Sequence, residues 1–326
     1  MPIRVGFLGV AHMHAWGYVH ALQHRSDAQL AGVWDSDPQR AEAFASKSGQ
    51  SAFADADQLL SEVDAVVICS ENRQHAALGV VAAQHGKHIL CEKPLVTSKE
   101  EADVFLGAAK AAGVKLMTAF PCRYSPAWTR LKERVKAGDV GKIKAICATN
   151  RGRCPFDWFV ETDKSGGGAM IDHTVHVADL LRDLLGKAPE RVFAQTGHNM
   201  YEKAWEDTAM LTLDYGDGVF ATLDSSWSRS QSFKTWGDVT MSVVGEEGVI
   251  EMDMFGQAID RYQDANMQHT LMGWGSNLDG SLVDDFVRCI LNDTAPTVSG
   301  EDGWEAARVA LAGYEAVRTG QPVALA

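Results

Sequence analysis

The sequence predicts an α/β protein in two parts, a doubly wound parallel sheet followed by a domain that contains an antiparallel sheet. In the first part, short apolar strands alternate with helical segments, as βαβ units require. In the second part, strand-like segments follow one another with only turns between them, which favours antiparallel pairing. At 326 residues, the chain also exceeds the length at which one hydrophobic core usually stops growing. We therefore expect two domains, residues 1–120 and 121–326.

The first part is expected to contain these strands: Ile3–Gly9, Gln29–Trp34, Asp64–Cys69, Lys87–Cys91 and Val114–Ala119. The run Asp64–Cys69 is almost entirely apolar, which is typical of a strand with helices on both faces of its sheet. The helices expected between the strands are Ala15–Leu22, one that Pro38 opens at its first turn, Gln74–His85 and Ser98–Ala112.

The second part begins with a linking segment and a helix that ends near Ala137. An irregular stretch, Arg151–Ser165, precedes a triple glycine, Gly166–Gly168, which leads into another helix. The strands expected here are Lys142–Thr149, Arg191–Thr196, Thr208–Tyr215, Gly218–Ser226, Asp238–Val244 and Gly248–Met252. Two helices, Ser281–Leu291 and Trp304–Thr319, are expected to close the chain.

Charge and composition exclude several classes of partner. The formal net charge is −13 without a lysine- or arginine-rich run, so we expect neither nucleic-acid nor membrane-surface binding. No apolar run approaches the roughly 20 residues that a membrane span needs. Six scattered cysteines without a C-x-x-C pair favour reduced thiols over disulfides or structural zinc. Because the N-terminus enters a strand without a basic leader, we expect a cytoplasmic protein.

The turn after the first strand is where a dinucleotide-binding fold carries G-x-G-x-x-G. Here the frame runs from Gly9 to His14 and keeps one glycine of three, with Ala11 at the second position. The following helix N-terminus still offers backbone N–H groups to a phosphate. Asp35, at the end of the second strand, is stronger evidence, because a carboxylate there can accept ribose hydroxyls. Its charge favours NAD over NADP, although Arg40 leaves NADP open, and Asp35 can alternatively cap the next helix.

The fourth expected strand stops abruptly at Glu92-Lys93-Pro94. In open α/β sheets, ligands bind beyond the carboxyl ends of the strands, which is where Lys93 is expected to point. Pro94 ends the strand and allows a cis Lys93–Pro94 bond. The alternative is a turn of charged residues on the surface.

The helix after the triple glycine carries Asp172 and His176 four residues apart, on one face. Histidine titrates near neutral pH and is the usual general base, and a carboxylate can orient it. Next to a bound nicotinamide, Lys93 can polarise a hydroxyl or relay a proton. The alternatives are a helix-capping role for Asp172 and a core histidine at position 176.

Several motifs in order resemble the Gfo/Idh/MocA family of oxidoreductases over nearly the whole chain. They are Glu92-Lys93-Pro94, Arg123-Tyr124-x-Pro126, Gly138-x-x-Gly141-Lys142-Ile143, the triple glycine before Asp172-x-x-x-His176-x-x-Asp179, and Thr319-Gly320-Gln321-Pro322-Val323. The resemblance implies an N-terminal Rossmann domain and a C-terminal α/β domain with a large, mostly antiparallel sheet. It also implies a homodimer or homotetramer, NAD or NADP as cofactor, and a sugar, polyol or cyclic alcohol as substrate.

The resemblance also implies roles for individual residues. Lys93 would hydrogen-bond the reacting hydroxyl and the nicotinamide ribose, His176 would take the hydroxyl proton, and Asp172 would position the substrate or the histidine. The expected cofactor-binding residues are Gly9, Ala11, His12, Met13, Asp35, Ser70, Asn72, His75, Glu92 and Lys93. The expected substrate-binding residues are Arg123, Trp158, Asp172, His173 and His176. The segment Ser70–His75 departs from the family's Thr-Pro-Asn-x-x-His.

Histidines 12, 14 and 173 have no place in the family outline. His12 or His14 can hydrogen-bond phosphate or reach the substrate, and four histidines near one crevice could also hold a metal, since imidazole suits zinc. We nevertheless expect no metal, because neither histidine segment has tight ligand spacing. Five tryptophans are candidates for stacking against a sugar ring, although most are expected in the core: Trp16, Trp158, Trp227, Trp236 and Trp274.

The predicted function is NAD(P)-dependent hydride transfer to or from a secondary alcohol of a sugar, polyol or cyclitol. One alternative is redox-neutral elimination or glycoside cleavage that returns NAD unchanged. The other is a non-catalytic sensor on the same fold, which is disfavoured because both Lys93 and His176 are present.

Overall fold

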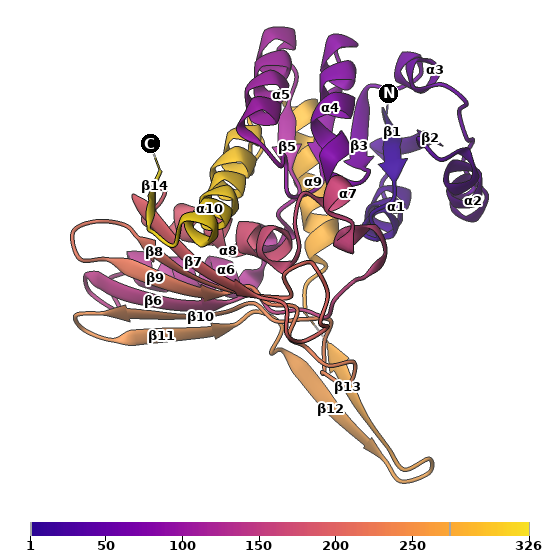
Figure 1. The fold of residues 1–326 in the computed structure, drawn as a ribbon. Helices are drawn as coiled ribbons and strands as arrows, with labels where there is room; N and C mark the ends of the chain where they lie inside the picture. Colours follow the sequence, from indigo (N-terminus) through magenta and orange to yellow (C-terminus); the bar gives the residue numbers. More distant parts are fainter. Residues whose placement is uncertain (1, 274, 326) are drawn as a thin grey trace. The chain divides into compact units, whose positions relative to one another are not determined.

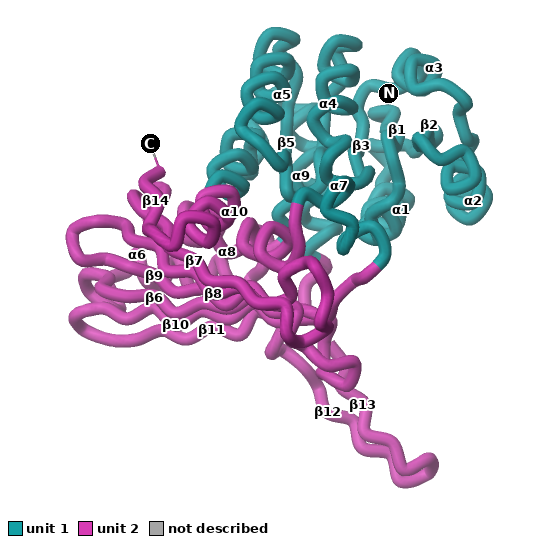
Figure 2. The backbone as a smooth tube through the Cα atoms, in the orientation of Figure 1, with its two compact units in different colours: residues 1–121, 157–166, 278–308 teal, residues 122–156, 167–277, 309–326 magenta. Residues whose placement is uncertain are grey.

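The computed structural model describes residues 2–273 and 275–325, which form two compact units (Figure 2). The first contains residues 1–121, 157–166 and 278–308, and the second contains residues 122–156, 167–277 and 309–326. The expected boundary at residues 120 and 121 divides the chain once, whereas two later segments return to the first unit. The separate roles expected for residues 1–120 and 121–326 stay a prediction.

The first unit is built on a parallel sheet with the strand order β2-β1-β3-β4-β5. The strands are β1 (Ile3–Val10), β2 (Ala28–Trp34), β3 (Ala65–Cys69), β4 (His88–Cys91) and β5 (Leu116–Thr118). From β1 the chain goes to β2 on one side and then crosses to β3 on the other. Ligands of open α/β sheets bind beyond the carboxyl ends of the strands at such a switch point. The turns after β1 and β3 are therefore the first place to look for a cofactor.

Helices pack on this sheet as the sequence predicts, with α4 and α5 side by side (Figure 1). The first unit contains α1 (Ala15–Gln23), α2 (Pro38–Ser48), α3 (Ala56–Ser61), α4 (His75–Gln84), α5 (Lys99–Ala112), α7 (Thr162–Ser165) and α9 (Leu278–Leu291). It also contains two 3₁₀ turns, η1 (Asn72–Gln74) and η3 (Asp157–Val160). Helix α10 (Gly300–Thr319) begins in the first unit and ends in the second. Helix α3 was not predicted, because six residues are too few to show helical periodicity.

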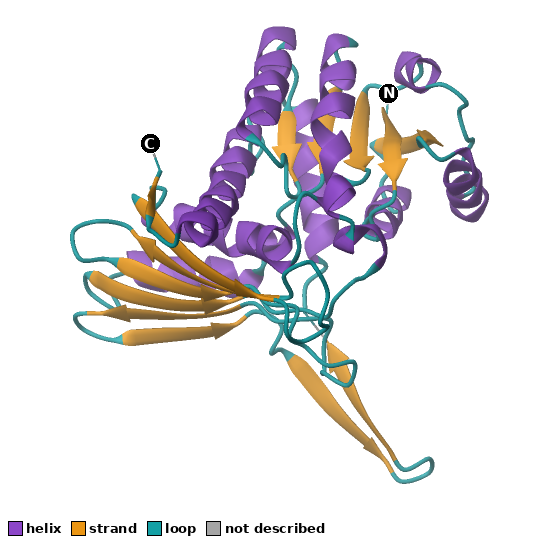
Figure 3. Ribbon diagram, viewed as in Figure 1, coloured by secondary structure: helices purple, strands orange, loops and turns teal. Residues whose placement is uncertain are grey.

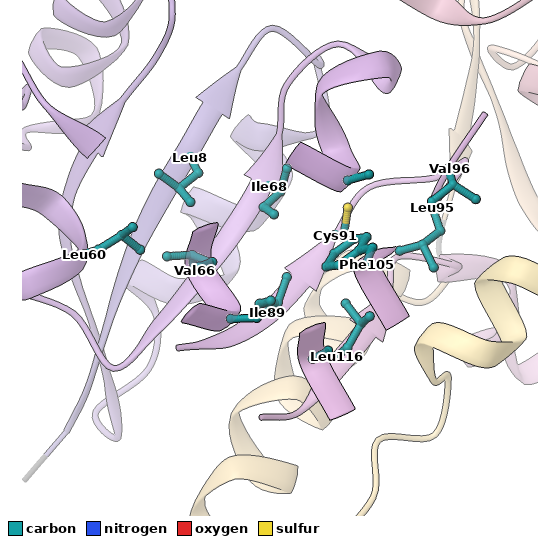
Figure 4. Packing of buried hydrophobic residues seen from close by; sticks show 14 of the residues in the cluster. Leu8, Leu60, Val66, Ile68, Ile89, Cys91, Leu95, Val96, Phe105 and Leu116 are labelled. Atoms are coloured by element: carbon teal, nitrogen blue, oxygen red, sulfur yellow. The ribbon is translucent and has the colours of Figure 1, made fainter. Parts of the chain in front are cut away.

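The core of the first unit lies between the sheet and α4 and α5 (Figure 4). Val66 and Ile68 of β3, Ile89 of β4 and Phe105 of α5 are fully buried in it. Strands of this kind have apolar side chains on both faces, which explains their continuous apolar runs. This core fixes the carboxyl ends of β1, β3 and β4, from which the candidate cofactor residues extend.

Local signals set the helix boundaries in the first unit. The Asp37 carboxylate accepts the backbone N–H groups of Gln39 and Arg40, and Pro38 occupies the first turn of α2. The alternative that Asp35 caps this helix is therefore wrong, because the capping residue is Asp37. The Ser98 side chain accepts the N–H of Glu101 and caps α5 in the same way.

The second unit is built on a larger sheet with the strand order β11-β10-β6-β9-β8-β7-β14 (Figures 1 and 3). Its strands are β6 (Ile143–Thr149), β7 (Arg191–Gly197), β8 (Thr208–Asp214), β9 (Phe220–Asp224), β10 (Thr240–Gly245), β11 (Val249–Asp253) and β14 (Val323–Ala324). Every neighbouring pair is antiparallel except β6 and β9, so the expected mostly antiparallel sheet is confirmed. In β8, buried and exposed residues alternate, as expected of a sheet with one covered face.

The helices of the second unit are α6 (Pro126–Lys136) and α8 (Ala169–Leu185), together with the end of α10. Helix α8 is buried at every position from Ala169 to Leu181. A hairpin of β12 (Ala258–Gln263) and β13 (Gln268–Gly273) extends away from the large sheet (Figure 3). The sequence did not predict this hairpin, because most of its residues are exposed and leave no buried alternation to detect.

Among the described residues, no helix combines the length and the apolar character that crossing a membrane requires.

Candidate cofactor-binding and active site

The turn between β1 and α1 is tight and lies against the residue after β3. Gly9 has φ +79°, and a Cβ at this position would lie 2.5 Å from the Cβ of Ser70, so only glycine fits. The backbone N–H of His12 donates to the carbonyl of Cys69 at 2.8 Å. The Ala11 carbonyl accepts the indole N–H of Trp158 at 3.2 Å. The turns after β1 and β3 therefore meet at the switch point of the sheet, where the sequence places a phosphate.

Asp35 lies at the end of β2 and is almost completely buried. Its Oδ2 accepts the N–H of Val10 at 2.7 Å, and its Oδ1 accepts the N–H of Asp37 at 2.8 Å. The Nη2 of Arg40 donates to the same Oδ1 at 2.7 Å and to Oε1 of Glu71 at 3.0 Å. With three donors already bound, the carboxylate retains acceptor capacity for fewer hydroxyls than the sequence suggested.

Two buried polar atoms, one on the Asp35 partner Arg40 and one on Asn72 after β3, are open to a polar ligand such as a dinucleotide. The Nε of Arg40 and the Oδ1 of Asn72 have no hydrogen-bond partner among residues 2–273 and 275–325. Buried groups of this kind are normally paired, so an unpaired donor and an unpaired acceptor indicate a polar ligand. The Nδ2 of Asn72 donates to the carbonyl of Ser165 at 2.8 Å, which fixes the orientation of the amide.

The other residues expected to bind the cofactor divide into structural and exposed ones. The two ring nitrogens of His75 lie 2.8 Å from the Pro94 carbonyl and 3.3 Å from the Ser70 carbonyl, so its buried ring connects the turns after β3 and β4. The Ser70 hydroxyl donates to the carbonyl of Glu71 at 3.1 Å. Met13, by contrast, is 46% exposed and presents a side chain to solvent.

Glu92 and Lys93 follow β4, and both are buried, so the alternative of a surface turn is wrong. The hydroxyl of Tyr18 donates to Glu92 Oε1, and the Nδ1 of His14 lies 3.1 Å from the same oxygen. The backbone N–H of Lys93 donates to Glu92 Oε2 at 3.1 Å, and the Nε2 of His12 is 3.9 Å from that oxygen. The Lys93–Pro94 bond is cis. We call Glu92 and these partners the Glu92 cluster.

The Glu92 cluster is an arrangement of fixed charges. Burial alone would raise the pKa of the Glu92 carboxyl, but the charges of His12 and His14, the hydrogen bond to His14 and the charge of Lys93 hold it well below its usual value. Burial lowers the pKa of the His14 imidazole, yet the charge of Glu92 and the hydrogen bond to it raise that pKa above 6.5 overall. Glu92 is therefore an anion at neutral pH, and it lies next in sequence to the predicted catalytic lysine.

His12, His14 and Glu92 are also the residues of the first unit best arranged to hold a metal ion. Each offers one ligand atom, and these atoms lie within 4.8 Å of one another. The sequence did not reveal this arrangement, because the third ligand comes from a distant segment. Tyr18 was missed for a related reason, although its position one helical turn after His14 is a usable signal.

In the second unit, tight packing of glycine sets the start of α8. The N–H of Gly168 donates to Oε1 of Glu206 at 2.7 Å, and Tyr314 donates to the same oxygen at 2.5 Å. A Cβ at Gly168 would lie 2.3 Å from the Glu206 carbonyl oxygen, which explains the glycine. The carboxylate of Glu206 thus holds the beginning of the helix that carries Asp172, His173 and His176.

Asp172 accepts the indole N–H of Trp227 at 3.0 Å, and the Nε2 of His173 lies 3.3 Å from the same Oδ2. Helix α8 begins at Ala169 after Gly168, so Asp172 lies beyond the capping position. His176 follows one turn later, and all three side chains are buried. The expected spacing of Asp172 and His176 on one helix is therefore present.

An aromatic cluster that the sequence analysis missed adjoins Asp172. The ring of Trp205 lies 5.5 Å from that of Trp227, and Tyr201 lies 5.5 Å from Trp205. Phe156, which is 44% exposed, lies 5.4 Å from Tyr201. Tyr201 and Trp205 lie between two predicted strands, and this aromatic pair in a connecting segment could have indicated the cluster from the sequence. Trp205 and Tyr201 are better placed to stack on a ligand than Trp227, which is fully buried.

Two residues expected to bind substrate are engaged in structural contacts. The Nε and Nη2 of Arg123 donate to the two oxygens of buried Asp179 at 2.7 and 2.8 Å. Trp158 is buried, stacks on Phe159 at 3.9 Å and donates its indole N–H to Ala11. These contacts favour a role in holding the fold for both side chains. Of the other tryptophans, Trp16 and Trp236 are exposed, and Trp274 lies outside the described residues.

The predicted site residues fall in both units. The cofactor residues and Lys93 belong to the first unit, and so does Trp158, whereas Arg123, Asp172, His173 and His176 belong to the second. The second unit also contains an open groove of about 800 Å³ between α6 and β11. Tyr124, Arg130, Glu133, Arg134 and Glu251 are among its lining residues, and no predicted site residue lines it.

Comparisons with known proteins identify the family to which the chain belongs. Residues 3–120 match the family described as "Oxidoreductase family, NAD-binding Rossmann fold", and residues 128–251 match the "GFO/IDH/MocA C-terminal domain". The myo-inositol 2-dehydrogenase of Thermotoga maritima is 28% identical, over 97% of this chain and 96% of that protein. The inositol 2-dehydrogenase of Rhizobium meliloti is 27% identical over the full length of both. The crystal structure of GenD2 from gentamicin A biosynthesis, in complex with NAD, has a TM-score of 0.90 at 24% identity, over 100% of this chain and 97% of that one.

The predictions of a Rossmann fold, an NAD cofactor and oxidoreductase activity are thus confirmed. The chain belongs to the GFO/IDH/MocA family of NAD-binding oxidoreductases.

Proposed function

We propose that this oxidoreductase transfers a hydride between NAD and a secondary alcohol of a sugar, polyol or cyclitol. The observation that carries the proposal is the pair Asp172 and His176, one turn apart on buried helix α8. The names of relatives support the substrate class. They include inositol 2-dehydrogenases, a 1,5-anhydro-D-fructose reductase of Ensifer adhaerens and a D-apiose dehydrogenase of Paraburkholderia graminis.

In the oxidative direction, bound NAD would supply the acceptor for the hydride of the carbinol carbon. His176 takes the proton from the hydroxyl as its C–O bond becomes a ketone, because an imidazole is the usual general base for such a proton transfer. Asp172 acts on the substrate or on the histidine, and the indole N–H of Trp227 keeps its carboxylate in place. The products are a ketone, NADH and a proton, so atoms and electrons balance.

Lys93 is the second proton-active group of the proposal. Its ammonium donates a hydrogen bond to the reacting hydroxyl and stabilises the negative charge that develops on oxygen. Buried Glu92 supplies the compensating negative charge that stabilises this ammonium in its buried position.

We further propose that residues 1–120 bind NAD and residues 121–326 bind substrate and form a homodimer or homotetramer. Light scattering on purified protein tests the assembly, and a monomer at micromolar concentration would contradict it.

We also propose a cytoplasmic protein without nucleic-acid partners. The net charge of −13 and six free cysteines support that proposal.

The activity is tested by incubating the purified chain with NAD and a panel of inositols, pentoses, hexoses and linear polyols. Appearance of NADH absorbance with at least one member is the expected result. Failure to bind NADH, together with no reduction of NAD by any member, would reject the proposal. Consumption of a sugar without net NADH would instead indicate redox-neutral chemistry, which begins with the same oxidation.

A further inference from the structure

Arg40 bears on how strongly the site discriminates between NAD and NADP, which the family assignment does not decide. In dinucleotide-binding folds, an acid after the second strand hydrogen-bonds the ribose 2′-hydroxyl of NAD, whereas a nearby arginine accommodates the 2′-phosphate of NADP. This chain has both, with Asp35 at the end of β2 and Arg40 five residues later. The sequence therefore favours NAD but does not show how far the site discriminates against NADP.

The structure shows where the charge of Arg40 is directed. Its Nη2 donates to Asp35 at 2.7 Å and to Glu71 at 3.0 Å, and the two acceptor side chains are 0% and 7% exposed. Gln74 donates from its Nε2 to the other oxygen of Glu71 at 3.1 Å, which orients that carboxylate towards the arginine. One cation is thus shared by two buried anions that come from the ends of different strands.

Glu71 lies two residues after the end of β3, next to Asn72. We propose that Glu71 acts as a specificity residue: with Asp35 it holds Arg40 in an ion cluster, so that the site selects NAD and rejects NADP. This inference rests on the proposed function only in requiring that the chain binds a nicotinamide dinucleotide.

Charge balance explains the selection. Asp35, Glu71 and Arg40 together carry one net negative charge, so a phosphate placed beside them meets repulsion from two carboxylates and a guanidinium whose Nη2 already donates to both of them. A bare ribose hydroxyl carries no charge and can donate to a carboxylate. Asp37 adds to the repulsion, although its own oxygen is occupied by the capping of α2. Lys164 also senses the charge of Glu71, but its ammonium is paired with Glu161 at 2.7 Å.

The test compares the dissociation constants of NAD and NADP by isothermal titration calorimetry in the wild type and variants. The wild type is expected to bind NAD more tightly. In Glu71→Gln, the ratio of the NADP constant to the NAD constant should fall about tenfold, because Arg40 is released from one of its two partners. In the double variant Glu71→Gln/Arg40→Ala, the ratio should return towards the wild-type value. Circular dichroism melting confirms that each variant is folded.

Glu62→Gln is the matched control, because Glu62 pairs with Arg4 at 3.0 Å near the amino end of β1, remote from the switch point. It makes the same charge change and should leave the ratio unaltered. An unchanged ratio in Glu71→Gln overturns the proposal, and so does a fall that persists in the double variant, since only the loss of an anion would then matter. Wild-type protein that binds neither dinucleotide would instead reject the proposed function.

Discussion

Glu92 and Asp172 are two buried carboxylates, one in each unit, that are held by similar partners. Each accepts a hydrogen bond from an aromatic side chain, Tyr18 for Glu92 and Trp227 for Asp172. Each also lies beside a histidine, at 3.1 Å from His14 and 3.3 Å from His173. The two carboxylates therefore have the same kinds of partner, an aromatic hydrogen-bond donor and a histidine.

The secondary structure around the two carboxylates differs. Glu92 follows a strand, and its histidine partners come from the turn after β1, about 80 residues earlier in the sequence. Asp172 lies in the first turn of a helix, and its histidine partner is the next residue. What the two share is a neighbour that can move a proton: Lys93 directly after Glu92, and His176 one turn after Asp172. In both units, a carboxylate held by hydrogen bonds thus lies next to a residue that can transfer a proton.

Removing the two proton-active neighbours should have the largest effect. In Lys93→Ala and in His176→Ala, turnover with a responsive polyol is expected to fall by about 10²–10⁴-fold, as is typical for lost acid–base catalysis. NADH binding, followed by quenching of tryptophan fluorescence, should be largely retained. The matched controls are Lys99→Ala and His269→Ala, which remove exposed side chains of the same types. Near-normal turnover in either test variant would remove that residue from the mechanism.

Neutralising Glu92 should have the next largest effect. Glu92→Gln keeps the shape of the side chain but leaves the charges of His14 and Lys93 without their shared anion. The free energy of unfolding, measured with urea, is expected to fall by about 3 kcal/mol, because breaking a buried ion pair leaves uncompensated charge. Glu62→Gln, in an exposed pair, should cost less than about 1 kcal/mol. Equal losses in the two variants would show that the Glu92 cluster has no special stabilising role.

The two carboxylates also differ in their capacity to bind a metal ion. Glu92 forms a group of three potential ligands with His12 and His14, whereas Asp172 and His173 do not have a third ligand of this kind among the described residues. We expect the Glu92 cluster to be an ion network without metal, since Tyr18 and Lys93 already use the carboxylate. Treatment with EDTA should then leave the melting temperature unchanged. A lower melting temperature after EDTA, restored by zinc alone, would identify a metal site instead.

The sequence predicted the strands of the first unit well because each is a continuous apolar run between helices, as in Asp64–Cys69. It also identified Lys93 and the Asp172–His176 pair as candidate catalytic residues, since both belong to local motifs. It did not predict the contacts of Tyr18 with Glu92 or of Glu71 with Arg40. These contacts join residues 74 and 31 positions apart, and only the folded sheet brings them together.

Two residues expected to bind substrate, Arg123 and Trp158, make contacts within the fold that the sequence did not predict. Arg123 and Trp158 are polar or aromatic residues in irregular segments, which is typical of binding sites. The structure uses their donors within the fold, with Arg123 on Asp179 and Trp158 on Ala11. Residue type alone does not show whether a hydrogen-bonding group already has a partner, because the partner lies far away in sequence.

The smallest expected effect is a pH dependence of stability that comes from the Glu92 cluster. The pKa of His14 is raised above 6.5 in the folded state, where Glu92 and Asp279 favour its charged form against burial and the charge of Lys93. A raised pKa gives stability that is fully present below pH 6.5 and is lost as the pH rises through the folded-state value. The pKa of Glu92 is lowered, so its contribution is present above pH 4.5 and is lost on acidification.

Other histidines act in the opposite direction, because burial lowers the pKa values of His75 and His88. The wild-type curve therefore mixes several groups, and the difference between wild type and His14→Gln isolates one of them. The unfolding free energy of the wild type relative to this variant should decrease as the pH is raised from 6.5 to about 8, because the folded state loses a proton that the unfolded state has already lost. A difference that stays constant over this range would mean that His14 is neutral beside Glu92.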